Sequence, residues 1–450
     1  MAPLNFAFWV PNVSRGLVNS KVPQRTSHDL DYNIKLAQIA EEKGFTFALT
    51  QIRFMSAHDG DEQYESVSYS HALLAQTKKL NVIAAILPGP WHPALTAKTF
   101  ASIDHYTGGR ISINVVSGWY KQEQAAMGLE WPEHDGRYVR STEFIRSIRG
   151  LWNEPSFSLD GQFYKFDNYS MEPKPSIRVS TSSPSTNHGT LHSSKAPTEG
   201  TRGPIIFMGG NSAAARRMAG TEADWFFLNG NDDETFTKWI LDVRANAQAA
   251  GRRIKVGIHG FVIAKPTTEE AYLQLNHIVN GANPEQVSQL YEAFKEAGKS
   301  APEGEGMWAK ANFKDLVQYN EGFRTGLIGS YDDVARRIIQ LKSLGADLVL
   351  TAYLHFQDEL AEFGDKVIPL VRQYEQEAID SGEAKSWPTF ENYPVPEDVA
   401  AKWAHKKVSG TVDHIAVAEQ LASKKRANGE ANGDSNGDAN GHGDAKRIKV

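Results

Sequence analysis

Short runs of consecutive apolar residues recur along the chain, and segments with apolar positions at helical spacing lie between them. The strand-like runs cover residues 4–10, 47–51, 80–87, 110–116, 204–210, 224–229, 254–264 and 346–354. Their unbroken apolar character is typical of parallel strands that helices cover on both faces. In the helix predicted over residues 29–45, one apolar face is formed by Leu30, Ile34, Leu36, Ile39 and Ala40.

Eight strand-then-helix units predict an α/β fold, a parallel eight-fold (β/α)8 barrel of the TIM type. An open, doubly wound sheet is the second choice, because it requires no such number of units. The helix before the last strand run has Ser330 as its predicted N-cap and Gly345 as its stop. We expect a barrel domain over residues 1–378, an extension over 379–423 and a tail over 424–450.

Three segments depart from the repeat. A hairpin-like stretch precedes a Ser/Thr/Pro-rich run at about 176–203, which we expect to be a mobile insertion. The excursion at about 281–327 is either a lid over the site or an arm that docks on another subunit. The tail from 424, a Gly/Asn/Asp repeat between basic clusters, is expected not to fold. It is either a solvating segment or a nuclear-import address.

Composition narrows the classes of function. The 450 residues are 40% hydrophobic, and the net charge of −6 gives no reason to expect nucleic acid or a membrane surface as a partner. The chain has no cysteine, which excludes disulfides, thiolate nucleophiles and cysteine metal sites. The N-terminus lacks the pattern of a secretory signal, and no apolar run is long enough to span a bilayer. We expect a cytoplasmic protein, or a nuclear one if the basic clusters are an address.

Polar residues gather where the predicted strands end, which is where such barrels bind ligands. The fourth run carries Asn114, and the fifth ends in Gly209-Gly210-Asn211-Ser212 directly before a helix. Glycines let the backbone approach a ligand, and a helix N-terminus favours an anion, so a phosphate suits this turn. An ordinary turn and cap is the alternative. The chain lacks a nicotinamide fingerprint and metal-ligand spacing of its histidines, so we predict a phosphorylated ligand and no metal.

Four stretches resemble the bacterial-luciferase-like, reduced-flavin-dependent monooxygenases: "FALTQIRF", "VIAAILPGPWHPALTAKTFASIDHYTGGRISINVVSGW", "EHDGRYVRSTEFIRSIRGLW" and "FMGGNSAAARRMA". The resemblance covers about residues 4–375 without the low-complexity insertion, and the run 82–119 is similar to the branch that oxygenates dimethylsulfone. It implies a luciferase-like barrel that uses reduced FMN as cofactor and O2 as co-substrate. It also implies a separate NAD(P)H-dependent flavin reductase as partner and a homodimer or homotetramer.

The resemblance implies a role for each residue at the strand ends. Asn114 is similar to a family asparagine that bonds to the flavin ring, with a core amide as the alternative. Arg137, Tyr138 and Ser212, with the turn glycines Gly209 and Gly210, resemble the phosphate-binding set. Their alternatives are surface pairing, core packing and simple capping.

Three further residues are implied as cofactor contacts. Thr50 and Gln51 resemble the pair beside the flavin ring. Glu123 matches an acidic position near the cofactor, and a solvated helix residue is the alternative.

The catalytic side follows from the same resemblance. Tyr353 and His355 match a Tyr-x-His pattern in the alkanesulfonate branch, and Arg324 matches its mobile-loop arginine, with a solvated arginine as the alternative. His259 lies where that branch has an Arg-x-His pattern. The missing arginine removes a partner for a sulfonate charge and favours a neutral sulfone.

The implied reaction converts dimethylsulfone to methanesulfinate and formaldehyde. The alternatives are an alkanesulfonate or pyrimidine monooxygenase of the same family, a deazaflavin-dependent oxidoreductase, and a non-catalytic flavin-binding protein.

Overall fold

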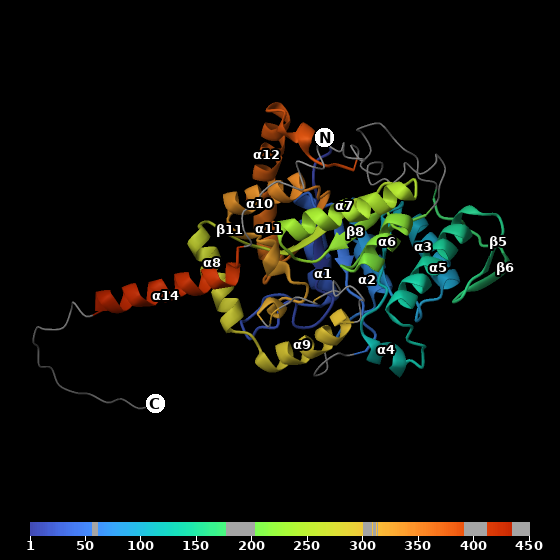
Figure 1. Ribbon diagram of the computed structural model, residues 1–450, viewed down its shortest axis with the longest axis horizontal. Coiled ribbons are helices and arrows are strands. Elements are labelled where there is room, and N and C mark those ends of the chain that lie inside the picture. Colours follow the sequence, from blue (N-terminus) through green and yellow to red (C-terminus); the bar gives the residue numbers. More distant parts are fainter. Residues whose placement is uncertain are drawn as a thin grey trace, which may run out of the picture.

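Eight parallel strands close into a barrel in the computed structural model of the protein (Figure 1). The structure describes residues 1–55, 62–176, 203–299, 308, 312, 314–390 and 412–433. The barrel strands are β1 (Asn5–Val10), β2 (Phe47–Thr50), β3 (Asn81–Ile86), β4 (Ile111–Val115), β7 (Ile205–Gly209), β8 (Trp225–Leu228), β9 (Lys255–Phe261) and β12 (Leu348–Ala352). Pairing of β12 with β1, where Leu350 lies opposite Ala7, closes the barrel. The predicted barrel is confirmed, and each predicted run contains one barrel strand.

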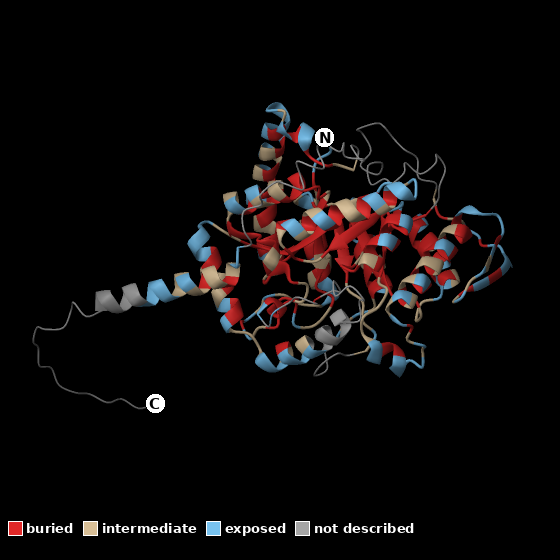
Figure 2. Ribbon diagram, viewed as in Figure 1, coloured by how far each residue is buried: buried red, intermediate tan, exposed pale blue. Residues whose placement is uncertain are grey.

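The helices lie outside the barrel strands, and those that pack on the barrel turn a buried face toward it (Figure 2). They are α1 (Leu30–Glu42), α2 (Ser66–Ala75), α3 (Pro93–Thr107), α4 (Lys121–Ala126), α5 (His134–Asn153), α6 (Ala213–Glu222), α7 (Asp233–Ala249), α8 (Thr268–Asn280), α9 (Pro284–Lys299), α10 (Tyr331–Ser343), α11 (Phe356–Lys366), α12 (Ile368–Asp380) and α14 (His414–Gly433). Short 3-10 helices are η1 (Asp315–Val317), η2 (Gly322–Thr325) and η3 (Glu383–Ser386). Ser330 caps α10 through the N–H of Asp333, and Gly345 follows its last turn, as predicted.

Large side chains fill the interior of the barrel. The inward-facing cluster, called here the interior core, is Ala7, Phe47, Leu49, Ile83, Ile205, Phe207, Trp225, Phe227, Leu348 and Leu350. The rings of Phe207 and Trp225 stack with their centroids 5.5 Å apart, and Phe47 meets Phe207 edge-on at 5.3 Å. None of these side chains is more than 6% exposed. The interior is therefore packed solid, and a ligand has room only beyond the strand ends.

Two small sheets lie outside the barrel. β5 (Phe157–Asp160) and β6 (Lys165–Tyr169) form the antiparallel hairpin that the sequence predicted. β10 (Ile263–Lys265) and β11 (Ile328–Ser330) pair in parallel, and β10 lies partly within the last residues of the run predicted as one strand over 254–264.

The segment 281–327 contains α9, η1 and η2. Its described residues pack on the barrel of the same chain. The backbone N–H of Asn19, after β1, donates to the carbonyl of Val317, and that of Gly230, after β8, donates to Asn320. The 281–327 segment therefore lies over the carboxyl ends of these strands, and the choice between a lid and a docking arm stays a prediction.

Within the described residues beyond α12, the short helix η3 is followed by α14, which packs on α8 (Figure 1). The sequence predicted an unfolded tail from residue 424. That boundary is wrong, because α14 continues to Gly433. The predicted insertion at 176–203 and the basic cluster near the C-terminus lie almost wholly outside the described residues. Among the residues that the structure describes, no helix combines the length and the apolar character needed to cross a bilayer.

Candidate active site

The carboxyl ends of the barrel strands form a mouth, lined by side chains that point inward. Trp9, Asn114 and His259 are each paired with an interior-core residue on a neighbouring strand. Directly paired residues of parallel strands share one face of the sheet, so these three point into the barrel. They lie near the carboxyl ends of β1, β4 and β9, and the mouth therefore combines an indole, an amide and an imidazole.

Asn114 has the environment expected of a ligand contact. Its side chain is 8% exposed, and its Oδ1 is buried with no hydrogen-bond partner among the described residues. A buried polar atom without a partner costs about 1–3 kcal/mol, so native structures rarely keep one without a ligand or water to complete it. The alternative of a satisfied core amide is not what the structure shows.

The turn after β7 forms a cradle at the start of α6. Ser212 caps the helix: its hydroxyl accepts the N–H of Ala215 at 3.2 Å and donates to the Tyr138 hydroxyl at 3.1 Å. Gly210 has φ 155°, and a Cβ there would lie 2.8 Å from that of Ala215, so only glycine fits. Together with Gly209, which ends β7, these residues place α5 beside a helix N-terminus that favours an anion.

Arg137 adds a cation next to Tyr138 on α5. Its Nη1 donates to the carbonyl of Gly118 after β4, and its guanidinium carbon lies 4.8 Å from the centre of the Trp131 ring. Burial lowers the pKa of Arg137, but a guanidinium stays charged at neutral pH. A cation, a phenol and a helix N-terminus fit the phosphate of a flavin mononucleotide.

Two residues predicted as cofactor contacts have structural partners instead. The carboxylate of Glu123, 4% exposed, accepts the N–H groups of Phe54 and Met55 at 2.7 and 3.0 Å, which ties the loop after β2 to α4. Thr50 is fully buried, and its hydroxyl lies 3.0 Å from that of Ser70 on α2. Its side chain therefore faces outward from the barrel, away from the mouth.

Gln51, the next residue along, stays at the mouth. Its backbone N–H donates to Asn12 Oδ1 at 2.9 Å, and its Nε2 donates to the carbonyl of Val10 at 3.0 Å. These bonds fix the half-buried amide between the ends of β1 and β2.

His355 stands on the rim of the mouth at the start of α11. Its Nδ1 accepts the N–H of Arg25 at 3.1 Å, so the neutral ring carries its proton on Nε2. Burial lowers the pKa of His355 below the ordinary value, and the carboxylate of Glu359 opposes this shift. The imidazole is therefore neutral at neutral pH and offers a donor at Nε2.

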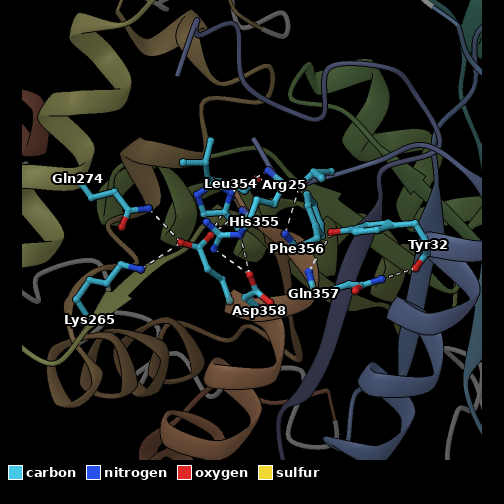
Figure 3. A network of polar contacts seen from close by, with 11 residues as sticks. Arg25, Tyr32, Lys265, Gln274, Leu354, His355, Phe356, Gln357 and Asp358 are labelled. Carbon is cyan, nitrogen blue, oxygen red and sulfur yellow. Dashed lines mark hydrogen bonds and ion pairs between the residues drawn. The ribbon is translucent and has the colours of Figure 1, made fainter. Parts of the chain in front are cut away.

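A carboxylate organises the backbone around this histidine (Figure 3). Glu359, 8% exposed, accepts the N–H groups of Leu354 and His355, each at 3.0 Å. Lys265 and Gln274 point toward the same carboxylate at 3.2 and 3.0 Å (Figure 3). The network fixes the start of α11 and with it the position of the imidazole.

Tyr353 does not reach the mouth. It is 1% exposed, and its ring packs edge-on against Phe356 and Phe363 of α11, with centroids 5.6 and 6.1 Å away. Burial raises the pKa of its phenol well above the ordinary value. This is the geometry of a core residue between β12 and α11, and it gives the predicted catalytic role of Tyr353 no support.

His259 lies inside the barrel beneath the 281–327 segment. The indole Nε1–H of Trp9 donates to its Nδ1 at 3.1 Å, and its Nε2 lies 3.3 Å from Oε1 of Gln318. Burial leaves it 1% exposed and lowers its pKa to about 4. His259 is thus a neutral group enclosed by protein, which connects the 281–327 segment to β1.

Arg324 is held in place rather than solvated. Its Nη1 donates to the carboxylate of Glu321 at 2.8 Å, and its Nη2 donates to Asn231 Oδ1 at 3.0 Å. Desolvation raises the pKa of Glu321 to about 7, although the guanidinium opposes the shift. This arginine clamps the 281–327 segment to the connection after β8.

Several other buried amides also have an atom without a hydrogen-bond partner among the described residues, and three of them lie after barrel strands or in the 281–327 segment. They are Asn211 Oδ1 after β7, Asn229 Nδ2 after β8 and Gln318 Nε2 in the 281–327 segment. The first two follow apolar runs directly, and that position was the signal available in the sequence. Gln318 has no local signal, because only the folded chain brings it to the mouth. Trp9 was not predicted as a ligand contact, because an aromatic residue in a strand usually belongs to the core.

No three His, Asp or Glu side chains gather as a metal site within the described part of the chain. A surface cavity of about 460 Å³ lies between the β1–α1 connection and α9, lined by Arg15, Val18, Ser20, Val22, Gln24, Asn283 and Gln286. This lining shares no residue with the mouth.

A closed parallel barrel with an anion cradle and unpartnered amides at its strand ends belongs to the class of ligand-binding barrel enzymes. The chain belongs to the luciferase-like monooxygenase family, whose model matches residues 4–348. The resemblance found in the sequence is therefore confirmed.

Individual relatives agree with this family. The FMNH2-dependent dimethylsulfone monooxygenase of Pseudomonas putida is 52% identical over 375 residues, which are 83% of this chain and 97% of the relative. A pyrimidine monooxygenase of Allorhizobium ampelinum is 27% identical over 377 residues, which are 81% and 95% of the two chains. The solved structure of DmoA from Hyphomicrobium sulfonivorans matches with a TM-score of 0.63 at 18% identity, covering 90% and 97%. At that identity the structural likeness shows the fold alone.

Proposed function

We propose that the protein is a reduced-FMN-dependent monooxygenase that converts dimethylsulfone to methanesulfinate and formaldehyde. The observation that carries the proposal is the 52% identity over 83% of the chain to a relative of that name. The unpartnered Oδ1 of Asn114 and the cradle of Arg137, Tyr138 and Ser212 support it, because a flavin ring and its phosphate need such partners.

The reaction balances with reduced flavin as the reductant. One C–S bond breaks, one oxygen atom of O2 oxidises the released methyl carbon to formaldehyde, and the other leaves as water. When bound, reduced FMN supplies the two electrons and activates the O2. In this proposal the chain's own residues bind the phosphate, orient the ring through Asn114, exclude water and present the Nε2–H of His355 to the reacting atoms.

Anaerobic titration with reduced FMN, followed by oxygen and substrate, tests the proposal. Reduced FMN should bind at micromolar protein, and dimethylsulfone should yield methanesulfinate and formaldehyde. A panel with alkanesulfonates and pyrimidines is the matched comparison. Turnover of those compounds but not of the sulfone would contradict the assigned substrate, and no flavin binding would contradict the cofactor.

Two partners complete the proposal. A separate NAD(P)H-dependent flavin reductase supplies reduced FMN, and oxygen consumption should therefore require both proteins or an added reductant. We also propose a homodimer or homotetramer, and light scattering at micromolar concentration should give a mass at least twice that of the 49.8 kDa chain.

A further inference from the structure

Trp9 is an inward-facing aromatic residue at the mouth. It is the penultimate residue of β1, and its register partner Leu49 belongs to the interior core. It is packed against that core but only partly buried, whereas the core residues themselves are closed off. Trp9 therefore lies on the strand-end side of the interior core, which is where such barrels bind ligands.

A hydrogen bond fixes this ring from behind. Nδ1 of His259 lies 3.1 Å from both the indole nitrogen of Trp9 and the carbonyl oxygen of Leu350. Oε1 of Gln318 faces Nε2 at 3.3 Å and can only accept, so we assign the proton to Nε2, and Nδ1 then accepts the indole N–H of Trp9. With a pKa of about 4, His259 keeps this neutral form at neutral pH.

Gln318 is itself held by the 281–327 segment. Its Oε1 also accepts the backbone N–H groups of Asn320 and Gly322 at 3.1 and 2.6 Å, and these donors settle which way the amide points. A Cβ on Gly322 would lie 2.7 Å from Nε2 of His259, so the close approach requires glycine. The segment that covers the mouth is therefore connected to the ring of Trp9 through two hydrogen bonds.

We propose that Trp9 contacts the substrate in the mouth and determines its specificity, and that His259, which also contacts Gln318, holds Trp9 in position. The proposal rests on the monooxygenase function proposed above. An indole face is apolar, polarisable and negative in its electrostatic potential. It suits small neutral molecules whose methyl hydrogens carry partial positive charge, as those beside a sulfonyl group do. It provides no positive charge or hydrogen-bond donor for a sulfonate anion.

Three variants and one double variant test both parts. Trp9→Leu removes the ring and should raise KM for dimethylsulfone about tenfold or more, while the affinity for reduced FMN stays within about twofold. Trp9→Phe keeps a ring but lacks the N–H and should lose about threefold in KM. His259→Leu should lose about as much, and Trp9→Phe/His259→Leu should lose no more than either single variant, because both remove the same bond.

The outcomes separate this inference from the proposed function. Unchanged KM in Trp9→Leu, or a loss confined to flavin affinity, would overturn the substrate contact, and additive losses in the double variant would overturn the positioning role. If the wild-type protein does not oxygenate the sulfone, the proposed function fails. Anaerobic binding of dimethylsulfone to the flavin complex, followed by flavin fluorescence, then tests Trp9 directly: weaker binding in Trp9→Leu supports the contact, and equal or absent binding in both proteins overturns it.

Discussion

At the scale of the residue, two polar side chains show how differently the strand ends are used. Asn114 lies in an apolar strand, and its Oδ1 is buried without a hydrogen-bond partner among the described residues. This oxygen therefore needs a hydrogen-bond donor from a ligand or from water. The hydroxyl of Ser212 is fully engaged, because it accepts from Ala215 and donates to Tyr138. Substitution of Ser212 should therefore act through the shape of the cradle.

Ser212→Ala removes the cap of α6 and the link to Tyr138, each worth about 1 kcal/mol. We expect the affinity for reduced FMN to fall roughly tenfold, with turnover at saturating flavin little changed. Anaerobic fluorescence titration measures the affinity. Ser212→Thr keeps the hydroxyl and should bind like wild type, and equal affinity in Ser212→Ala would show that the cradle does not hold the phosphate.

His355→Ala should have the opposite effect. Loss of a proton donor at the reacting atoms should lower oxygenation about a hundredfold, with hydrogen peroxide released in place of product. The affinity for reduced FMN should be nearly unchanged, because no cradle residue is altered.

His355→Asn is the matched control. Its amide oxygen retains an acceptor for the N–H of Arg25 and so keeps the loop after β1 in place. It has no ring proton, so it should be as slow as His355→Ala. Oxygenation at the wild-type rate in His355→Asn would mean that the imidazole only positions the loop.

At the scale of the element, apolar runs predicted the barrel strands to within two residues at most ends, because a strand buried on both faces has few polar positions. The helix faces were less predictable. The buried positions of α1 are Asn33, Leu36, Ala37 and Ala40, whereas Leu30, predicted on the inner face, is 37% exposed. The barrel decides how far a helix is rotated, and local spacing alone does not fix it.

The 281–327 segment was beyond local prediction. Its course depends on backbone bonds from Val317 to Asn19 after β1, almost three hundred residues away in sequence, and from Asn320 to Gly230 after β8, about ninety residues away. The clamp between Arg324 and Glu321 belongs to this element, and its carboxyl group should give it a measurable pH dependence.

Glu321 has a folded-state pKa of about 7, above its ordinary value of 4.5. Between these values the folded state holds a proton that the unfolded state has lost, so stability falls as pH rises from about 4.5 to about 7 and stays lower above. Glu321→Gln should remove this loss. We expect it to be more stable than wild type by on the order of 1–3 kcal/mol at pH 8, with the difference vanishing near pH 4.5.

Unfolding in urea at several pH values measures this difference. The Gln variant retains an acceptor for Arg324, which also keeps its bond to Asn231. A constant difference between the two proteins across the pH range would contradict the raised pKa.

At the scale of the whole molecule, the barrel explains which candidate residues meet. Asn114 faces inward, and Tyr138 meets Ser212, although 74 residues separate the last two in sequence. Thr50 and Tyr353 face outward against α2 and α11. Alternate strand residues face opposite sides, so an assignment shifted by one residue moves a side chain from the site to the outer core.

The C-terminal helix α14 should stabilise the cover of the mouth. Ile415 and Ala418 are buried, His414 Nδ1 lies 2.7 Å from the Tyr272 hydroxyl of α8, and Glu419 pairs with Lys314 in the 281–327 segment. Truncation after residue 411 should lower the melting temperature by several degrees and increase the share of reduced flavin lost to hydrogen peroxide. Truncation after residue 433 keeps α14 and is the control. Equal peroxide yields in the two truncated proteins would mean that α14 does not support the cover.

The interior core fills the barrel, so no channel runs from one end of the described strands to the other. Side chains fill its interior, so ligands cannot pass through the barrel and must reach the mouth from the side of the strand ends. When ligands enter a site from one side, the ligand that binds deeper must bind first and dissociate last. If the flavin ring lies deeper than the substrate, it must enter first and leave last, and the small products must depart before oxidised flavin is exchanged. The kinetics should accordingly be ordered, with dimethylsulfone unable to bind productively before reduced FMN and an excess of it slowing flavin exchange.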